Sequence, residues 1–430
     1  MEANKNRNEQ KKFIKNTGWL IFDKIVHMLM SLVVTGAVAR HLGEYDYGII
    51  NYGLSFVNIF AIISKMGIDG IIVSELVKDK ENEGTIVGTT LGLRMISSLL
   101  SILATLIFVY VLNPSEWIVV VVSVIESFTL IGWVFDTLDY YFQANLLSKY
   151  SALARTLSYP VVCVYRLLLV WLESSLVWFA FATVIDALII GILLVWFYRK
   201  SKGRKLSFSW CFGKHLLSQG RHFILVNLLV TIYTQMDRLM IGGLADQSQV
   251  GLYSAAMTIA NLWVFIPNAL IDSARPIIME LKYQHKEVLY QKRWSQLHAA
   301  IIWLSICAGV LVTFFGKLAL WIIYGEAFLG ALSVLLILIW SRLFSLLGLL
   351  RSTWMLCESL EKYIKYFIGL GAVMNMILNS MLIPKFGAEG AAVATLLTEI
   401  AASFVVSSLY KKTRGLTKHI FDGLFLRKIR

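Results

Sequence analysis

Residues 85–112 of this chain read TIVGTTLGLRMISSLLSILATLIFVYVL, with Arg94 as the single charged residue. An α-helix rises about 1.5 Å per residue, so a run of about 20 apolar residues crosses the roughly 30 Å hydrocarbon core of a bilayer. The stretch is therefore predicted to be a membrane-spanning helix. Its arginine raises a second question, because a charge inside a bilayer is costly.

Stretches of this kind recur along the whole chain. Hydrophobic residues make up 57% of its 430 residues, and the mean hydropathy is +0.68. This composition is too apolar for a soluble domain of that length. The sequence predicts an all-α polytopic membrane protein with about twelve transmembrane helices. The predicted spans are 17–39, 47–66, 85–112, 117–141, 152–171, 175–198, 219–242, 250–272, 296–320, 330–355, 363–383 and 388–410.

The basic residues between these spans are distributed unevenly. All but Arg40 and Lys385 lie on the side that carries both termini. Lys and Arg are enriched in cytoplasmic loops, so both termini are predicted to be cytoplasmic. The basic patch at 199–205 follows an aromatic span end, which favours a membrane-surface anchor over a nucleic-acid site. Residues 1–16 are polar, and no cleavable signal peptide is expected.

The chain is predicted to be duplicated. Tyr47-Gly48 begins the second span and Val250-Gly251 begins the eighth, and Ile68-Asp69 and Ile271-Asp272 close these spans at the same offset. Chance alignment of apolar helices is the alternative. Parallel repeats commonly place a substrate path between the halves. The predicted organisation is a cytoplasmic tail at 1–16, an N-lobe at 17–198, a basic cytoplasmic linker at 199–217, a C-lobe at 218–410 and a basic cytoplasmic tail at 411–430.

Motifs for enzymatic chemistry are missing from the sequence. Gly213-Lys214 and Gly316-Lys317 lack the earlier glycine and the following Ser or Thr of a phosphate-binding loop. The His and Cys residues show no metal-ligand spacing. We therefore expect the chain not to be an enzyme and to use no cofactor or metal. ATP-driven pumping by this chain alone is disfavoured.

Depth separates the Lys and Arg residues of the predicted spans. Long basic side chains near span ends reach the interface. Residues predicted to be such anchors are Lys65, Arg155, Lys317, Arg351 and Lys365. Arg40 and Arg238 lie near outer span ends, where they either line an outer mouth or mark the interface.

Four cations lie deeper, and they are expected to face the protein interior because a lipid-facing charge is expensive. They are Lys24, Arg94, Arg166 and Arg342. Each either lines a wet cavity that admits an anion or forms a buried ion pair. Carboxylates at comparable depth are Asp23, Glu126, Asp186 and Glu399, and the last two occupy equivalent places in the two predicted lobes.

Two segments resemble a known family. ARHLG at 39–43 is followed by Tyr47-Gly48 and Tyr52, and QMDRLMIG at 235–242 is followed by VGLYSAA at 250–256. These motifs are similar to those of polysaccharide-unit flippases in the multidrug/oligosaccharidyl-lipid/polysaccharide exporter superfamily. The resemblance extends over about residues 13–412.

The resemblance implies a flippase that moves undecaprenyl-pyrophosphate-linked O-antigen or capsule repeat units across a bacterial inner membrane by alternating access. A cationic cavity between the lobes would receive the pyrophosphate while the lipid tail stays in the bilayer. The cavity candidates are Lys24, Arg94, Arg166, Arg342, Arg40 and Arg238. An ion gradient would supply the energy, with Asp23 and Asp237 as candidate proton or ion carriers. The polysaccharide polymerase machinery is the protein partner that the resemblance suggests, and no nucleic-acid partner is expected.

Two other classes of membrane protein are alternatives for this sequence. A multidrug antiporter of the same superfamily exports cations and should have an acidic cavity, whereas the deep set here includes four cations. A membrane glycan polymerase or ligase usually presents a large outer loop, and none of the predicted outer connections is long. A non-transporting scaffold would not explain the buried charges.

Overall fold

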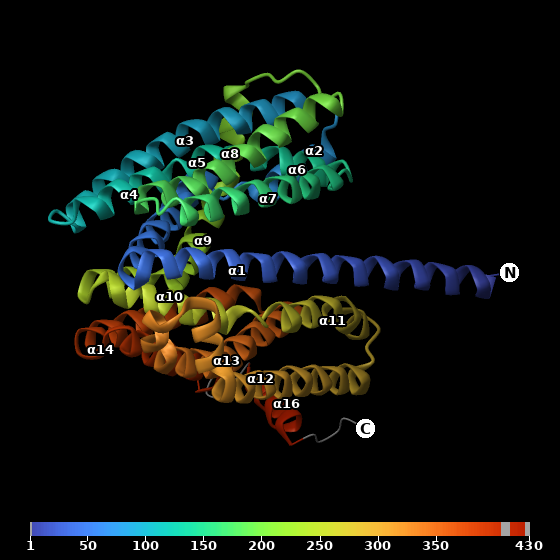
Figure 1. Cartoon of the computed structure of the whole chain (residues 1–430). Coiled ribbons are helices and arrows are strands. Elements are labelled where there is room, and N and C mark those ends of the chain that lie inside the picture. Colours follow the sequence, from blue (N-terminus) through green and yellow to red (C-terminus); the bar gives the residue numbers. More distant parts are fainter. Residues whose placement is uncertain (1, 406–412, 426–430) are drawn as a thin grey trace.

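The computed structural model describes residues 2–405 and 413–425, and for 2–27, 29, 222, 226, 404 and 414–418 it describes the backbone alone. Within this part of the chain the secondary structure is helical and no strand is present (Figure 1). Helices suit a bilayer because each one satisfies its own backbone N–H and C=O groups where water is absent. The predicted all-α fold is confirmed.

The helices form two bundles, which lie one above the other in Figure 1. The first, here called the N-lobe, contains the second half of α1 and the helices up to α8. Its elements are α1 (Glu2–Lys65), α2 (Asp69–Lys78), α3 (Glu83–Leu112), α4 (Trp117–Ser127), α5 (Thr129–Val134), α6 (Asp136–Ala144), α7 (Lys149–Trp171) and α8 (Leu176–Lys200). In Figure 1 the first half of α1 lies between the two bundles.

The second bundle, here called the C-lobe, begins with α9, which contacts both α1 and α14. Its elements are α9 (Trp210–Leu244), α10 (Gln247–Asn261), α11 (Phe265–Tyr283), α12 (Glu287–Tyr324), η1 (Glu326–Ala331), α13 (Leu332–Cys357), η2 (Glu361–Tyr363), α14 (Ile364–Ile400), η3 (Ala401–Val405) and α16 (Arg414–Leu424). In Figure 1 the N-terminus and the α11–α12 turn lie to the right, and the α3–α4 turn lies to the left.

Nine helices in the described residues are long and apolar enough to cross a membrane, or ten if α10 and α11, bent by 47°, count as one span. Two of the helical segments exceed one crossing. Met30–Lys78 has 49 residues and Glu361–Ser403 has 43. Both bend at a glycine with positive φ, Gly43 at 76° and Gly387 at 54°. These bends lie where the sequence predicted breaks between spans. The total of twelve spans and the cytoplasmic side of the termini stay predictions.

Helix α3 packs with its small polar residues inward and its large apolar residues outward. Ser97, Ser101 and Thr105 are buried. The Ser101 and Thr105 hydroxyls each donate to the carbonyl oxygen four residues earlier, at 2.8 Å. Leu103 and Ile107 are more than half exposed. Small residues let transmembrane helices approach closely, whereas lipid solvates large apolar ones. The exposed apolar face therefore fits a bilayer rather than water.

The lobes meet where α1 crosses α10, at two glycines. A Cβ on Gly48 would lie 1.7 Å from the Gln247 carbonyl oxygen, and one on Gly251 would lie 2.0 Å from the Glu44 carbonyl oxygen. The two backbones are therefore in direct contact. Gly48 and Gly251 are the residues that the predicted duplication pairs, and both lie at the crossing between the lobes.

Replacing Gly48 with alanine should lower the unfolding temperature of the purified protein and impair its activity in cells. The added methyl cannot fit without separating α1 from α10, and overpacking of this kind costs about 1–3 kcal/mol or more. Gly369→Ala is the matched control, because a Cβ there meets no atom within 4 Å. Equal unfolding temperatures for the two variants would contradict this close crossing.

Candidate functional site

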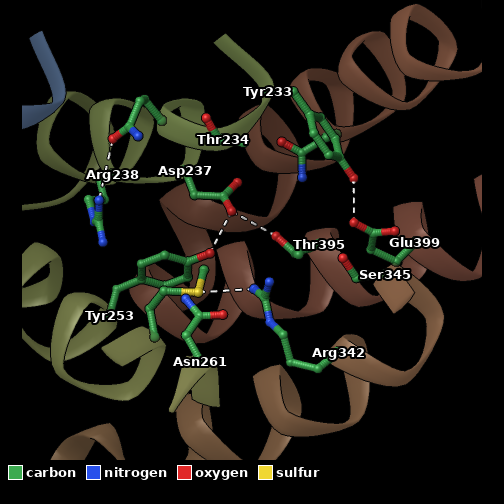
Figure 2. Close-up of a pocket in the computed structure, with 13 residues that line it drawn as sticks. Tyr233, Thr234, Asp237, Arg238, Tyr253, Asn261, Arg342, Ser345, Thr395 and Glu399 are labelled. Atoms are coloured by element: carbon green, nitrogen blue, oxygen red, sulfur yellow. Dashed lines mark hydrogen bonds between the residues drawn. The ribbon is translucent and has the colours of Figure 1, made fainter. Parts of the chain in front are cut away.

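A polar cavity of about 290 Å³ lies inside the C-lobe, among α9, α10, α13 and α14 (Figure 2). Two acidic and two basic side chains line it: Asp237, Glu399, Arg238 and Arg342. Ionisable groups within transmembrane helices almost always face the protein interior or a wet cavity. This cavity brings together three of the predicted site residues, Asp237, Arg238 and Arg342.

Asp237 lies at the centre of a hydrogen-bond cluster, and its side chain is 7% exposed. Its carboxylate accepts hydrogen bonds from the Tyr253 hydroxyl, from the Asn379 amide at 2.8 Å and from the Thr395 hydroxyl at 2.8 Å. Asn379 and Thr395 lie on opposite sides of the Gly387 bend in α14. Asp237 therefore links α9 and α10 to both arms of α14.

Oxygen atoms dominate the surroundings of Asp237. The amide nitrogen of Asn379 also donates to the side-chain oxygen of Asn375, at 3.0 Å. The buried side-chain oxygen of Asn379 itself has no hydrogen-bond partner among the described residues. A carboxylate beside amide and hydroxyl oxygens is the donor set that hard cations prefer. The cluster can thus hold a proton or a small cation.

Arg342 presents a poorly satisfied guanidinium to the same cavity. One of its terminal nitrogens donates to the sulfur of Met257 at 3.0 Å, and thioether sulfur is a weak acceptor. Its Nε is buried without a partner in the described part of the chain. Arg238, by contrast, donates to the Ser254 hydroxyl at 3.1 Å and to the Gln235 side chain at 3.3 Å. Arg342 is therefore the better-placed group for an anionic ligand.

Glu399 also lines this cavity, at the right of Figure 2, and accepts a hydrogen bond from the Tyr233 hydroxyl at 2.9 Å. Arg342 and Glu399 line this cavity with opposite charges. The C-lobe cavity thus combines positive and negative groups.

The N-lobe has a corresponding cavity around Arg166. One space of about 270 Å³ is lined by Arg166, Asp186 and Arg155, and a second of about 160 Å³ is also lined by Arg166. Asp186 accepts a hydrogen bond from Ser158 at 2.6 Å. Asp186 and Glu399, which the predicted duplication pairs, each lie in an arginine-containing cavity of their own lobe.

Arg94 does not line any of these cavities. It is 1% exposed and forms an ion pair with Asp69, and its guanidinium lies 5.4 Å from the centre of the Tyr140 ring. Of the two roles that the sequence left open, the structure supports the buried ion pair. The sequence could not show this pair, because it forms only when α2, which carries Asp69, packs beside α3, which carries Arg94.

Arg40 does not line any of these cavities and instead joins two helices. Its guanidinium donates to the carbonyl oxygens of Trp321 at 2.9 Å, of Ile322 and of Ile323 at 3.0 Å. These carbonyls end α12, where the last turn of a helix leaves acceptors unpaired and favours positive charge. Arg40 therefore fastens α1 to the C-terminal end of α12.

Lys24 and Asp23 lie on α1, but their side chains are outside the described residues. Arg351, predicted to be an interfacial anchor, is 5% exposed and donates to the Ala402 carbonyl oxygen at 2.5 Å. That prediction is wrong, because α14 and η3 cover the side chain within the C-lobe. Lys65 lies 5.5 Å from the centre of the Trp133 ring.

Sequence reasoning missed several polar residues around Asp237, namely Tyr253, Asn375, Asn379 and Thr395. One signal was present. Asn375 and Asn379 are four residues apart within an apolar span, so they share one helical face. Tyr253 belongs to the VGLYSAA motif at 250–256, although the motif does not show that its hydroxyl meets Asp237. Thr395 carries no such signal, because uncharged polar residues are common in transmembrane helices.

Comparisons with known proteins agree with this architecture. The profile of a family described as "Polysaccharide biosynthesis protein" matches residues 13–282. The chain is 21% identical over 410 residues to the capsular polysaccharide biosynthesis protein CapF of Staphylococcus aureus, covering 93% of this chain and 99% of that protein.

Solved structures with the same fold include an inward-facing multidrug resistance MATE family transporter of the MOP superfamily. It has a TM-score of 0.73 and 13% identity, with 93% of this chain and 96% of that chain covered. The lipid II flippase MurJ, in an inward closed conformation, has a TM-score of 0.70 and 13% identity, with coverage of 94% and 90%. At these identities the similarity establishes the fold.

Proposed function

Because the chain belongs to the polysaccharide biosynthesis protein family, we propose that it is a flippase for lipid-linked glycans. The proposed substrate is an undecaprenyl-pyrophosphate-linked O-antigen or capsule repeat unit, and the proposed membrane is a bacterial inner membrane. The name of CapF and the name of the lipid II flippase MurJ support this class of function. The polysaccharide polymerase machinery is the proposed protein partner.

The observation that carries the proposal is the arginine-containing cavity in each lobe. Arg342 and Arg238 line the C-lobe cavity, and Arg166 lines the N-lobe cavity. A guanidinium is planar, permanently charged and suited to paired hydrogen bonds with phosphate oxygens. In this proposal the arginines of the two cavities, one inside each lobe, bind the pyrophosphate, the glycan follows through the protein, and the lipid tail stays in the bilayer.

The Asp237 cluster is the proposed coupling site. A cation or proton bound by Asp237 would compete with the hydrogen bonds from Asn379 and Thr395, which hold the two arms of α14. Binding would therefore be linked to the Gly387 bend, and so to the position of α14 relative to α9. An ion gradient would drive the cycle through this link. On α1, Lys24 stays a candidate for binding the pyrophosphate, and Asp23 stays a candidate carrier of the coupling proton or ion.

A multidrug antiporter is the second candidate, and the mixed charge of the C-lobe cavity favours it. Asp237 and Glu399 are acidic groups of the kind that bind cationic drugs, and the MATE transporter has the same fold. A membrane glycan polymerase or ligase receives no support from these contacts, because no nucleophile and base are paired in either cavity as described.

Translocation of a fluorescent undecaprenyl-pyrophosphate glycan in proteoliposomes tests the function directly. We expect the purified protein to move the lipid between leaflets, and imposed proton or sodium gradients to accelerate this movement. An ionophore that collapses the gradient should remove the acceleration. Export of a cationic dye without movement of the glycan lipid would contradict the flippase and favour the antiporter.

A further inference from the structure

Glu126 on α4 is a buried acid that the proposed cycle does not yet use. Its side chain is 0% exposed, and neither carboxyl oxygen has a hydrogen-bond partner in the part of the chain that the structure describes. An ionised carboxylate in such a place lacks both water and donors, so the neutral acid is the favoured form. The surroundings of Glu126 therefore suit a protonated carboxyl group.

The backbone of α1 approaches Glu126 closely at Gly53. A Cβ on Gly53 of α1 would lie 2.6 Å from a carboxyl oxygen of Glu126 and 3.0 Å from the Ser123 hydroxyl. The carboxyl group thus lies directly against the α1 backbone. Immediately after Glu126 the helical hydrogen bonds shorten to a three-residue pattern, from Phe128 N–H to the Ile125 carbonyl at 3.1 Å. Such local tightening within a span often marks a functional hinge.

Polar side chains extend from Glu126 to the N-lobe cavity. Ser123 and Thr129 are each three residues from Glu126, so they neighbour it along the helix surface. Both hydroxyls are buried and have no partner in the described chain. Thr129 also lines the cavity that contains Arg166. The three side chains therefore form an unpartnered polar row that leads from the cavity to the buried acid.

The charged groups on the surrounding helices single out Arg166. On α3, Arg94 is paired with Asp69, and on α8, Asp186 accepts from Ser158. On α1, Gly53 faces Glu126. Arg166 on α7 lines the same cavity as Thr129, which ends the polar row beside Glu126. Burial without hydrogen-bond donors favours the neutral acid, whereas water that joins the carboxyl group to a guanidinium would favour the carboxylate.

We propose that Glu126 is a proton-binding site of the N-lobe. Its carboxyl group is neutral in the conformation seen here and releases its proton when the Arg166 cavity becomes hydrated. This inference rests on the proposed flippase function for its role in coupling. In the release step the O–H bond of the Glu126 carboxyl group breaks, and the proton passes to a water molecule of the cavity. The carboxylate that remains is then stabilised by the Arg166 guanidinium. The reverse step restores the acid.

The first experiment measures the proton on the wild-type protein in lipid. The infrared absorption of protonated carboxyl groups is compared between the wild type, Glu126→Gln and Glu361→Gln at neutral pH. Glu361 is exposed on η2 and serves as the matched control. We expect Glu126→Gln to lose a protonated-carboxyl band and Glu361→Gln to keep it. A wild-type spectrum with no band sensitive to Glu126→Gln would overturn the proposal.

The second experiment measures coupling in proteoliposomes. Glutamine imitates the neutral acid, so Glu126→Gln should still bind the glycan lipid but lose all acceleration by a proton gradient. Glu126→Asp should retain part of it, and Glu361→Gln all of it. An undiminished response in Glu126→Gln would overturn the coupling role. If the wild type moves no glycan lipid, the flippase proposal fails, whereas the infrared comparison still decides whether Glu126 holds a proton.

Discussion

Replacing Asp237 with asparagine should strongly reduce glycan export while the protein still inserts in the membrane. The amide keeps the shape of the side chain, but it removes the negative charge to which Tyr253, Asn379 and Thr395 donate. Hydrogen bonds to a charged group contribute about 1.5–3 kcal/mol each, and about 1.4 kcal/mol is a factor of ten. Export should fall by at least about tenfold, measured as surface glycan per cell in a strain that depends on this chain.

Asp272→Asn is the control for this experiment, because Asp272 is exposed on α11 and lies away from the cavity. It should export glycan normally at an equal membrane level of protein, measured by immunoblot. Normal export by Asp237→Asn at equal protein level would exclude Asp237 as the coupling site.

Replacing Arg342 with alanine should weaken binding of the pyrophosphate lipid by at least about tenfold, because a charge-assisted hydrogen bond contributes about 1.5–3 kcal/mol. Among the described residues its Nε has no hydrogen-bond partner, and the one hydrogen bond of its terminal nitrogens goes to the weakly accepting Met257 sulfur, so donors are free for a phosphate oxygen. Arg342→Lys should bind with intermediate affinity, since lysine keeps the charge but lacks the paired donors. Titration with a fluorescent pyrophosphate lipid measures the affinities of the purified wild type, Arg342→Ala and Arg342→Lys.

Lys317→Ala is the control for Arg342, because Lys317 is exposed on α12 outside both cavities. Its affinity for the lipid should equal that of the wild type. If Arg342→Ala also binds like the wild type, Arg342 does not recognise pyrophosphate. Tighter binding of a cationic drug by Arg342→Ala would then favour the antiporter.

The cations of the spans show where sequence reasoning ends. Depth along a helix identified Arg166 and Arg342 as interior, and both line cavities. The same argument grouped Arg94 with them, although Asp69 neutralises it. It also placed Arg351 at the interface, although that residue is buried. Depth describes the cost of a charge in lipid, whereas its partner depends on which helix packs beside it.

The sequence by itself determined that this chain is an all-helical membrane protein and that its spans break between residues 39 and 47 and between 383 and 388. Partition into lipid is a local property, so the order of residues is enough to predict these breaks. The structure places the bends themselves at Gly43 and Gly387. The tertiary structure alone decided the chemistry of the interior. Asp237 reaches Thr395 across 158 residues, and Arg40 reaches Trp321 across 281. Such contacts depend on the packing of distant helices, which hydropathy does not encode.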